Sequence, residues 1–310
     1  IKSTKRYKQQ KKLKIIIPKN NQEFLSKDIM NRMQMLLDVS SIDPAEHPFT
    51  VRMSENDVRI TTNYRNLTFS FESTMHEAGH ALYELNLPKK YYNTVLYEGP
   101  SLGIHESQSR FWENMIGKNK LFWQGYFNFF KKHSKIKKSQ LNFYKDYNIV
   151  KPSYVRVESD EVTYCLHIIL RFEIERDLIN GIIKPKDAKK EWNKRFKELF
   201  GIAVKKDSEG ILQDVHWSGG GIGYFPCYAI GSIYAAQQYY KMQKDIPNFK
   251  QKIKTLKFKP ILQWLIKNIH SKGRTMLADD IVKKATGESL NPKIFIKYLN
   301  EKYKEIYKFK

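Results

Sequence analysis

Two histidines four residues apart constrain this 310-residue chain more than any other feature. They are His76 and His80, in the segment HEAGHALYEL, whose residues favour a helix. Four residues make about one helical turn, so both imidazoles leave the same helix face and can reach one ion. Glu77 follows His76 directly, where a carboxylate can take a proton from metal-bound water. This HExxH pattern is typical of zinc hydrolases and predicts a helix that carries a metal site.

A catalytic zinc site needs a third protein ligand, because the HExxH helix supplies only two. A second helical stretch, HESQSRFWENMIG, begins at His105. Within it, Glu106 is a well-placed third ligand, as in zinc enzymes that use two histidines and one glutamate. His105 is the competing candidate, and the residues alone leave that choice open. The alternative, that His76 and His80 are merely buried structural histidines, is disfavoured by Glu77 and Glu106.

A strand is expected just before the HExxH helix. β-Branched residues alternate in VRMSENDVRITT, within the stretch 44–71. The free edge of such a strand could pair with an extended peptide and hold it over the metal. Asp57 and Arg59 lie on one face of this strand, where Arg59 is a candidate for contacting a substrate; the alternative is a cross-strand ion pair.

One arginine in the middle of the chain is a candidate for binding a carboxylate. A long helix is expected within 152–178, beginning near Arg156. A guanidinium at a helix beginning can grip a free carboxylate with two hydrogen bonds. The alternative is a salt bridge from Arg156 to Glu158, Asp160 or Glu161.

A glycine-rich run, Gly219 to Gly223, is the other informative loop. A phosphate cradle is disfavoured there, because no Lys-Ser/Thr follows and no GxGxxG register fits. His216 and Tyr224 flank the run, and each can donate a hydrogen bond to the oxyanion that forms when an amide carbonyl is attacked. The alternative is a polar pair satisfied within the core. Gln213 and Asp214 are expected to orient their neighbours.

The remaining segments predict a helical scaffold. Aromatic residues between 111 and 132 are interpreted as a stripe that faces the core rather than as a cofactor site. Helices are expected over 21–39, through most of 110–200, and at 260–270, 276–285 and 292–307.

The formal net charge of +23 raises the question of a nucleic-acid or anionic-membrane partner. The excess lysines are scattered over nearly every segment without a recognisable nucleic-acid module, so we expect no specific nucleic-acid partner. We also expect no membrane association, because no apolar run reaches the roughly 18 residues of a membrane span and no leader precedes the body. Two widely separated cysteines, Cys165 and Cys227, exclude a disulfide framework and fit a reducing cytoplasm.

The motifs, taken in order, resemble one known family. HEAGHALYE followed by GIHESQSRFWEN is similar to the M32 metallocarboxypeptidases, the carboxypeptidase Taq family, and the resemblance covers nearly everything from Leu37 onward. One departure is Ser159, where the family usually has alanine, a small change. Further motifs that resemble the family are EHPFT (46–50), DVRITT (57–62), VRVESDE (155–161) and GILQDVHWSGGGIGYFP (210–226).

Family members carry an additional helical region before these motifs. The resemblance therefore implies that residues 23–310 are the C-terminal catalytic domain, and that 1–22 are a basic N-terminal segment of a chain truncated relative to the family. Together the residues and the resemblance predict a mainly α-helical metallopeptidase of the gluzincin type, with a small β element beside the active-site groove.

The resemblance implies a metal-dependent carboxypeptidase that removes C-terminal amino acids from peptides, with Zn²⁺ or Co²⁺ as cofactor. It further implies a homodimer in the cytoplasm with peptide substrates. Two rivals remain: a zinc endopeptidase or oligopeptidase with the same metal residues, and an inactive remnant of a carboxypeptidase. The implied roles are metal ligation by His76, His80 and Glu106, catalysis by Glu77, His216 and Tyr224, and substrate binding by Arg156, Arg59 and His47.

Overall fold

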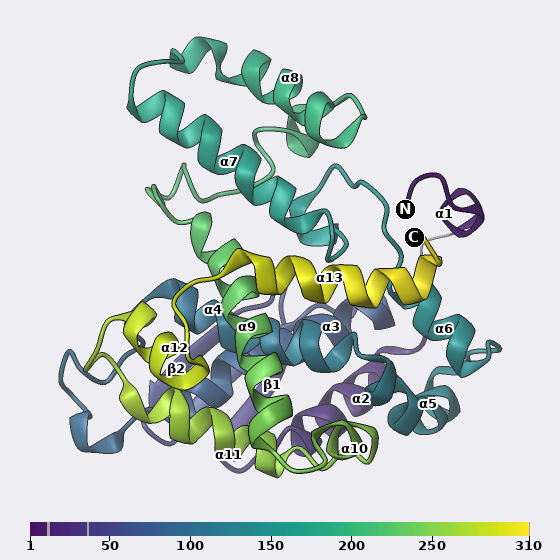
Figure 1. The fold of residues 1–310 in the computed structure, drawn as a ribbon, viewed down its shortest axis with the longest axis vertical. Coiled ribbons are helices and arrows are strands. Elements are labelled where there is room, and N and C mark those ends of the chain that lie inside the picture. Colours follow the sequence, from purple (N-terminus) through teal and green to yellow (C-terminus); the bar gives the residue numbers. More distant parts are fainter. Residues whose placement is uncertain (11–12, 36, 310) are drawn as a thin grey trace. The chain divides into compact units, whose positions relative to one another are not determined.

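The computed structural model describes residues 1–10, 13–35 and 37–309. The chain is mainly α-helical and, within the described residues, contains one small sheet, as the sequence predicts (Figure 1). It divides into two compact units. The larger comprises 11–147 and 230–302, and the smaller comprises 1–10, 148–229 and 303–310.

The sheet belongs to the larger unit and has the strand order β1-β3-β2. Strand β2 (Thr50–Ser54) pairs antiparallel with β3 (Asp57–Thr62), with Val51 opposite Arg59. These two strands confirm the predicted β element. Strand β1 (Ser40–Pro44), which pairs parallel with β3, was not predicted, because its sequence SSIDP has a single large apolar residue and no alternation.

Helix α3 (Leu67–Leu85) is the predicted HExxH helix. It begins where the Asn66 side chain accepts a hydrogen bond from the Phe69 backbone N–H, a cap that satisfies one of the free N–H groups at a helix start. Helix α3 packs against the sheet and against α2 (Lys19–Arg32) and α4 (Leu102–Arg110), so it is the central element of the larger unit.

Helix α2 is shorter than the predicted helix over 21–39. It ends at Arg32, and Gln34 has a φ of 70°, a left-handed conformation that cannot continue an α-helix. Residue 36, inside the predicted range, lies outside the described residues.

Helix α4 continues directly into a π-helix, η2 (Phe111–Gly117). Ser101 caps the start of α4 through a hydrogen bond from the Ile104 N–H. In η2 the backbone winds more widely, and the Lys118 N–H bonds to the carbonyl of Glu113, five residues back. The sequence predicts a helix here but not its π-helical winding.

The predicted aromatic stripe lies on α5 (Lys120–Ser134) and is buried. Phe122, Trp123 and Phe130 surround Phe71 of α3, with ring centroids 5.4 to 6.3 Å from it. These contacts hold one face of the HExxH helix in the core.

The C-terminal helices lie close to their expected positions. The first turn of α9 and the last turn of α13 are counted with the smaller unit. The remaining elements of the larger unit are α6 (Gln140–Tyr147), α9 (Pro226–Asp245), α10 (Phe249–Lys254), α11 (Lys259–Asn268), α12 (Ala278–Thr286), α13 (Pro292–Tyr307) and the short 3₁₀ turns η1 (Lys89–Tyr91) and η6 (His270–Lys272).

The smaller unit is built on α7 (Tyr164–Ile179) and α8 (Ala188–Phe200), which lie side by side (Figure 1). Its apolar core includes Leu170, Trp192 and Phe196. No helix in the described part of the chain has both the length and the apolar character that crossing a membrane requires. The other elements of this unit are α1 (Lys5–Gln9), η3 (Arg156–Glu158), η4 (Pro185–Asp187) and η5 (Asp207–Glu209).

Helix α7 begins later than the sequence predicts. Arg156 lies in the 3₁₀ turn η3, and the α-helix starts eight residues further on, at Tyr164. The Asp160 side chain accepts hydrogen bonds from the backbone N–H groups of Val162 and Thr163, which forms a turn that ends before the helix.

Candidate metal centre

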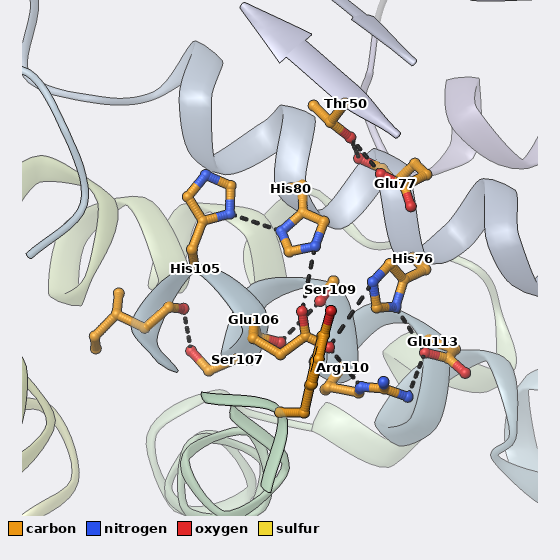
Figure 2. Close-up of polar contacts among 12 residues, drawn as sticks. Thr50, His76, Glu77, His80, His105, Glu106, Ser107, Ser109, Arg110 and Glu113 are labelled. Atoms are coloured by element: carbon orange, nitrogen blue, oxygen red, sulfur yellow. Dashed lines mark hydrogen bonds and ion pairs between the residues drawn. The ribbon is translucent and has the colours of Figure 1, made fainter. Parts of the chain in front are cut away.

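His76 and His80 lie on one face of α3, and Glu106 of α4 points between them (Figure 2). The Nε2 of His76 is 3.8 Å from one carboxylate oxygen of Glu106, and the Nε2 of His80 is 3.5 Å from the other. In the part of the chain that the structure describes, these three are the one group of possible metal ligands whose donor atoms all lie within 4.8 Å of one another.

His105, the competing third ligand, points elsewhere. Its Nδ1 lies 2.7 Å from the Nδ1 of His80, and its Nε2 lies 2.6 Å from a carboxylate oxygen of Glu84. It therefore contacts the ring edge of His80 that faces away from Glu106, and the geometry favours Glu106 as the third ligand.

Glu106 is buried but ionised. Its Oε1 accepts a hydrogen bond of 2.7 Å from the Nε of Arg110, one turn further along α4. Burial alone would raise the pKa of Glu106, but the charges of His76 and Arg110 outweigh it and lower that pKa to about 2.

A second carboxylate, that of Glu113, contacts His76 on the ring nitrogen that does not face Glu106. Glu113, in η2, accepts a 2.8 Å hydrogen bond from the Nδ1 of His76 and a 3.1 Å hydrogen bond from Arg110. Burial opposes ionisation of Glu113, yet the charge of Arg110 and the hydrogen bond from His76 hold its pKa well below the ordinary value. With Nδ1 donating to Glu113, the Nε2 of His76 is left with a lone pair toward Glu106.

The two histidines differ in their affinity for a proton. Burial would lower the pKa of His76, but the charges of Glu106 and Glu113 reverse this and raise it. For His80, burial prevails and lowers the pKa.

Glu77 is buried beside this group and is held by a residue from the sheet. Its Oε2 lies 2.7 Å from the hydroxyl of Thr50, at the start of β2 (Figure 2). Sequence reasoning assigned no role to Thr50 beyond its place in the EHPFT motif. Thr50 and Glu77 are far apart in sequence and meet only because β2 packs against α3, so no local pattern could have predicted the contact.

Two glycines allow the helices to approach closely enough to form the group. A Cβ on Gly79 would lie 2.7 Å from the Gln108 carbonyl oxygen and 2.7 Å from the Ser109 Cα. A Cβ on Gly231 of α9 would lie 2.6 Å from the Cγ of Glu106. All three distances are too short for a Cβ, so glycine at these two positions lets α4 lie against α3 and α9.

Comparison with known proteins identifies the family to which this chain belongs. A family model described as carboxypeptidase Taq (M32) metallopeptidase matches residues 1–303. The chain belongs to the carboxypeptidase Taq (M32) metallopeptidase family. The resemblance seen in the motifs is thereby confirmed.

Members of the M32 family are similar to this chain over most of its length. Carboxypeptidase 1 of Bacillus subtilis is 42% identical over 295 residues, which are 94% of this chain and 59% of that protein. Thermostable carboxypeptidase 1 of Pyrococcus furiosus is 44% identical over 266 residues, 84% of this chain and 53% of that protein. The crystal structure of the M32 carboxypeptidase from Deinococcus radiodurans superimposes with a TM-score of 0.91 at 33% identity, covering 94% of this chain and 60% of that one. The chain spans between 53% and 59% of the length of the two curated relatives.

Membership of this metallopeptidase family implies a metal cofactor, and the residues present fit one. In a tetrahedral site with metal–ligand bonds of about 2.0–2.2 Å, neighbouring ligand atoms lie roughly 3.4 Å apart. The observed separations of 3.5 and 3.8 Å between Nε2 atoms and carboxylate oxygens are close to this spacing. Two imidazoles and one carboxylate are also a donor set that leaves a fourth position open for water.

Arg156, in the smaller unit, is buried and already engaged. Its Nε and Nη2 donate to one oxygen of Asp214 at 3.0 and 2.7 Å, and its Nη1 donates to the Tyr164 hydroxyl. Arg171 donates to the other oxygen of Asp214. The ion-pair partner is thus Asp214 rather than Glu158, Asp160 or Glu161. Gln213 accepts from the Arg156 backbone N–H, so Gln213 and Asp214 both orient a neighbour, as predicted.

His216 and Tyr224 lie together in the same unit, with ring centroids 5.0 Å apart. The Nε2 of His216 is 3.2 Å from the hydroxyl of Tyr228. Burial and the charge of Arg156 lower the pKa of His216, so it is neutral near pH 7 and has one N–H to donate.

The other two predicted substrate contacts are exposed. Arg59 of β3 forms an ion pair of 2.8 Å with Asp57, two residues earlier on the same strand, rather than the cross-strand pair of the alternative interpretation. His47 precedes β2 and has an exposed side chain. Roles for Arg59 and His47 in substrate binding stay predictions.

Proposed function

We propose that this chain is a metal-dependent carboxypeptidase, which removes amino acids one at a time from the C-terminus of peptides. The observation that supports this most strongly is the convergence of His76, His80 and Glu106 on one point, with Glu77 on the same helix, in a chain of the M32 family. We propose Zn²⁺ as the native metal, with Co²⁺ able to replace it, because imidazole and carboxylate ligands suit both ions.

In this proposal Glu77 is the group that moves the proton. A bound zinc ion supplies Lewis acidity, which allows a water molecule to lose a proton near neutral pH. The Oε2 of Glu77 is held by Thr50, which leaves Oε1 to accept that proton and deliver it to the nitrogen of the leaving amine. Burial of Glu77 keeps the carboxylate in one orientation.

The edge strand β2 is proposed to bind the peptide. Within the described residues it has a sheet neighbour on one side only, β3. Val51 and Met53 are exposed at alternate positions of β2, so they lie on one face of the sheet. Side chains of a peptide paired with β2 would lie beside them on that face. Arg59 and His47 are proposed to contact the same peptide.

Arg156 is proposed to bind the substrate carboxylate, which restricts cleavage to the last residue. Its charge supports this role: Arg156 and Arg171 share the single carboxylate of Asp214, so the cluster keeps one positive charge that is not neutralised within it. His216 and Tyr224 are proposed to donate hydrogen bonds to the oxyanion of the tetrahedral intermediate.

Three further properties are proposed from the family resemblance. Residues 23–310 act as one catalytic domain, with 1–22 as a basic segment outside it. The enzyme is a homodimer. It works in the cytoplasm on peptide substrates.

The test is mass spectrometry of a defined synthetic peptide after incubation with the purified chain. Zinc or cobalt is added in parallel samples, and a chelator serves as the control. A chelator-sensitive ladder that loses one residue at a time from the C-terminus is expected. Internal cuts would instead identify an endopeptidase with the same metal residues. A chain that binds metal stoichiometrically and cuts nothing would contradict the proposal and indicate an inactive remnant.

A further inference from the structure

One network of hydrogen bonds beside the metal group has no part in the mechanism above. It links His80 of α3 to His105 of α4 and then to Glu84, near the end of α3. Glu84 also accepts a hydrogen bond from Arg52 of β2, so its carboxylate is paired with a permanent positive charge. The Arg52 guanidinium in turn lies 4.8 Å from the ring of Tyr97.

The proton positions in this hydrogen-bond network follow from its geometry. The two facing Nδ1 atoms are 2.7 Å apart, so one carries a hydrogen and the other accepts it. If a neutral His105 ring donated from Nδ1, its Nε2 would present a lone pair to the Glu84 carboxylate at 2.6 Å, which is repulsive. If His80 donates, His105 accepts at Nδ1 and donates from Nε2 to Glu84, and every contact is attractive.

This second arrangement leaves the Nε2 of His80 without a hydrogen, facing Glu106 at 3.5 Å. A histidine binds a metal through a deprotonated ring nitrogen, and the hydrogen bond made by the other nitrogen selects which one that is. We propose that His105, oriented by Glu84, is a positioning residue that fixes the tautomer of His80 for metal binding. The inference rests on the proposed metal site.

Two variants distinguish the proposed role of His105 from a merely structural one. If His105 only fills space, zinc affinity should fall when the ring is lost; if it fixes the tautomer of His80, zinc affinity should fall when the hydrogen-bond acceptor is lost. The ring of His105 packs edge-on against Tyr83, with centroids 5.1 Å apart, so His105→Phe keeps an aromatic ring but removes the acceptor. His105→Asn removes the ring but keeps a hydrogen-bond acceptor, because the amide oxygen takes the position of Nδ1 and can accept from His80. His133 is a partly buried histidine whose ring packs against Phe129 of α5 at a tilt, and His133→Phe controls for the substitution itself.

The experiment measures the zinc dissociation constant of each purified chain by competition with a chromophoric chelator. We expect His105→Phe to bind zinc roughly 10 to 100 times more weakly, with one ion still bound at saturation. His105→Asn and His133→Phe should stay within about threefold of the unsubstituted chain, well below that loss. Circular dichroism of the metal-free chains verifies that each variant is folded.

Three results would overturn the inference. One is unchanged zinc affinity in His105→Phe. Another is an equal loss in His105→Phe and His105→Asn, which would assign the effect to packing. The third is loss of the bound ion at saturation in both variants, which would make His105 itself a ligand. If the unsubstituted chain binds no zinc, the proposed metal site fails first, and that result is distinct from the other three.

Discussion

Glu77 is the residue whose chemistry can be separated most cleanly from metal binding. It lies on the same helix as two metal ligands, but it is not one of the three possible ligands, and one of its carboxylate oxygens accepts a hydrogen bond from Thr50 (Figure 2). We expect Glu77→Gln to keep the zinc affinity of the chain and to lower kcat at least 100-fold, because an amide cannot take a proton. Metal content and peptide turnover of the same preparation test this. Normal turnover would exclude Glu77 as the base.

Thr50 gives a second prediction at the scale of one hydrogen bond. Thr50→Val keeps the branched shape but removes the hydroxyl that holds Oε2 of Glu77. A hydrogen bond to a charged group contributes about 1.5–3 kcal/mol, so we expect kcat to fall roughly 10-fold or more, with zinc affinity unchanged. Thr50→Ser, which restores the hydroxyl, should recover most of the turnover. Equal activity of the valine and serine variants would contradict this role.

At the scale of helices, the metal group depends on how closely α3 and α4 approach. Alanine normally favours a helix over glycine by about 1 kcal/mol, so Gly79→Ala would stabilise α3 if space allowed. Here the new methyl would meet the backbone of α4 at Gln108 and Ser109, which cannot move aside. We expect a net destabilisation of about 1–3 kcal/mol and weaker zinc binding.

The matched control for this prediction is Gly117→Ala. At that position the nearest atom is also 2.7 Å away, but it is the sulfur of Met75, near the end of a flexible side chain. Denaturant unfolding and zinc affinity should therefore change less in Gly117→Ala than in Gly79→Ala. Similar losses in both variants would mean that the rigid backbone contact is not the cause.

Features within one element were predictable from the sequence, whereas features that join distant segments were not. Local spacing predicts the helix with His76 and His80, and alternation predicts β2 and β3. Local patterns could not predict that Asp214, 58 residues after Arg156, is its ion-pair partner. The same limit applies to Thr50 with Glu77, because long-range packing decides which side chains meet.

At the scale of the whole molecule, metal binding should be visible as stability. The ligands come from α3 and α4, which meet only in the folded chain, so zinc binds the folded state selectively. With free zinc at about 100 times the dissociation constant, this adds about 2.7 kcal/mol. We expect a chelator to lower the unfolding temperature of the purified chain, and excess zinc to restore it. A chelator-insensitive unfolding temperature would argue against a metal that bridges these helices.

Acid should destabilise the chain through two buried histidines, one in each unit. Burial lowers the pKa of His167 and of His270 to about 3, below the ordinary value of 6.5. A lowered folded-state pKa means that the unfolded chain binds the proton first, so stability is complete above pH 6.5 and is lost as pH falls toward 3. At pH 5.5 each histidine should cost about 1.4 kcal/mol relative to neutral pH.

His167→Phe tests this in the smaller unit, because the ring of His167 already packs against Phe200 at 4.4 Å. Urea unfolding with chelator present, at pH 7.5 and pH 5.5, gives the stability of both chains. The loss on acidification should be about 1.4 kcal/mol smaller in the variant than in the unsubstituted chain. Equal losses in the two chains would show that His167 does not titrate as its burial requires.

The π-helix η2 has a consequence for insertions and deletions. A helix whose hydrogen bonds join residues five apart closes each bonded turn over one more residue than a regular α-helix does. Deleting one residue after Arg110 would therefore restore a regular helix while turning Glu113 by about 100° away from its place behind His76. With one residue fewer, this segment would form a regular α-helix. The extra residue of the π-helix is therefore what brings the Glu113 carboxylate to His76.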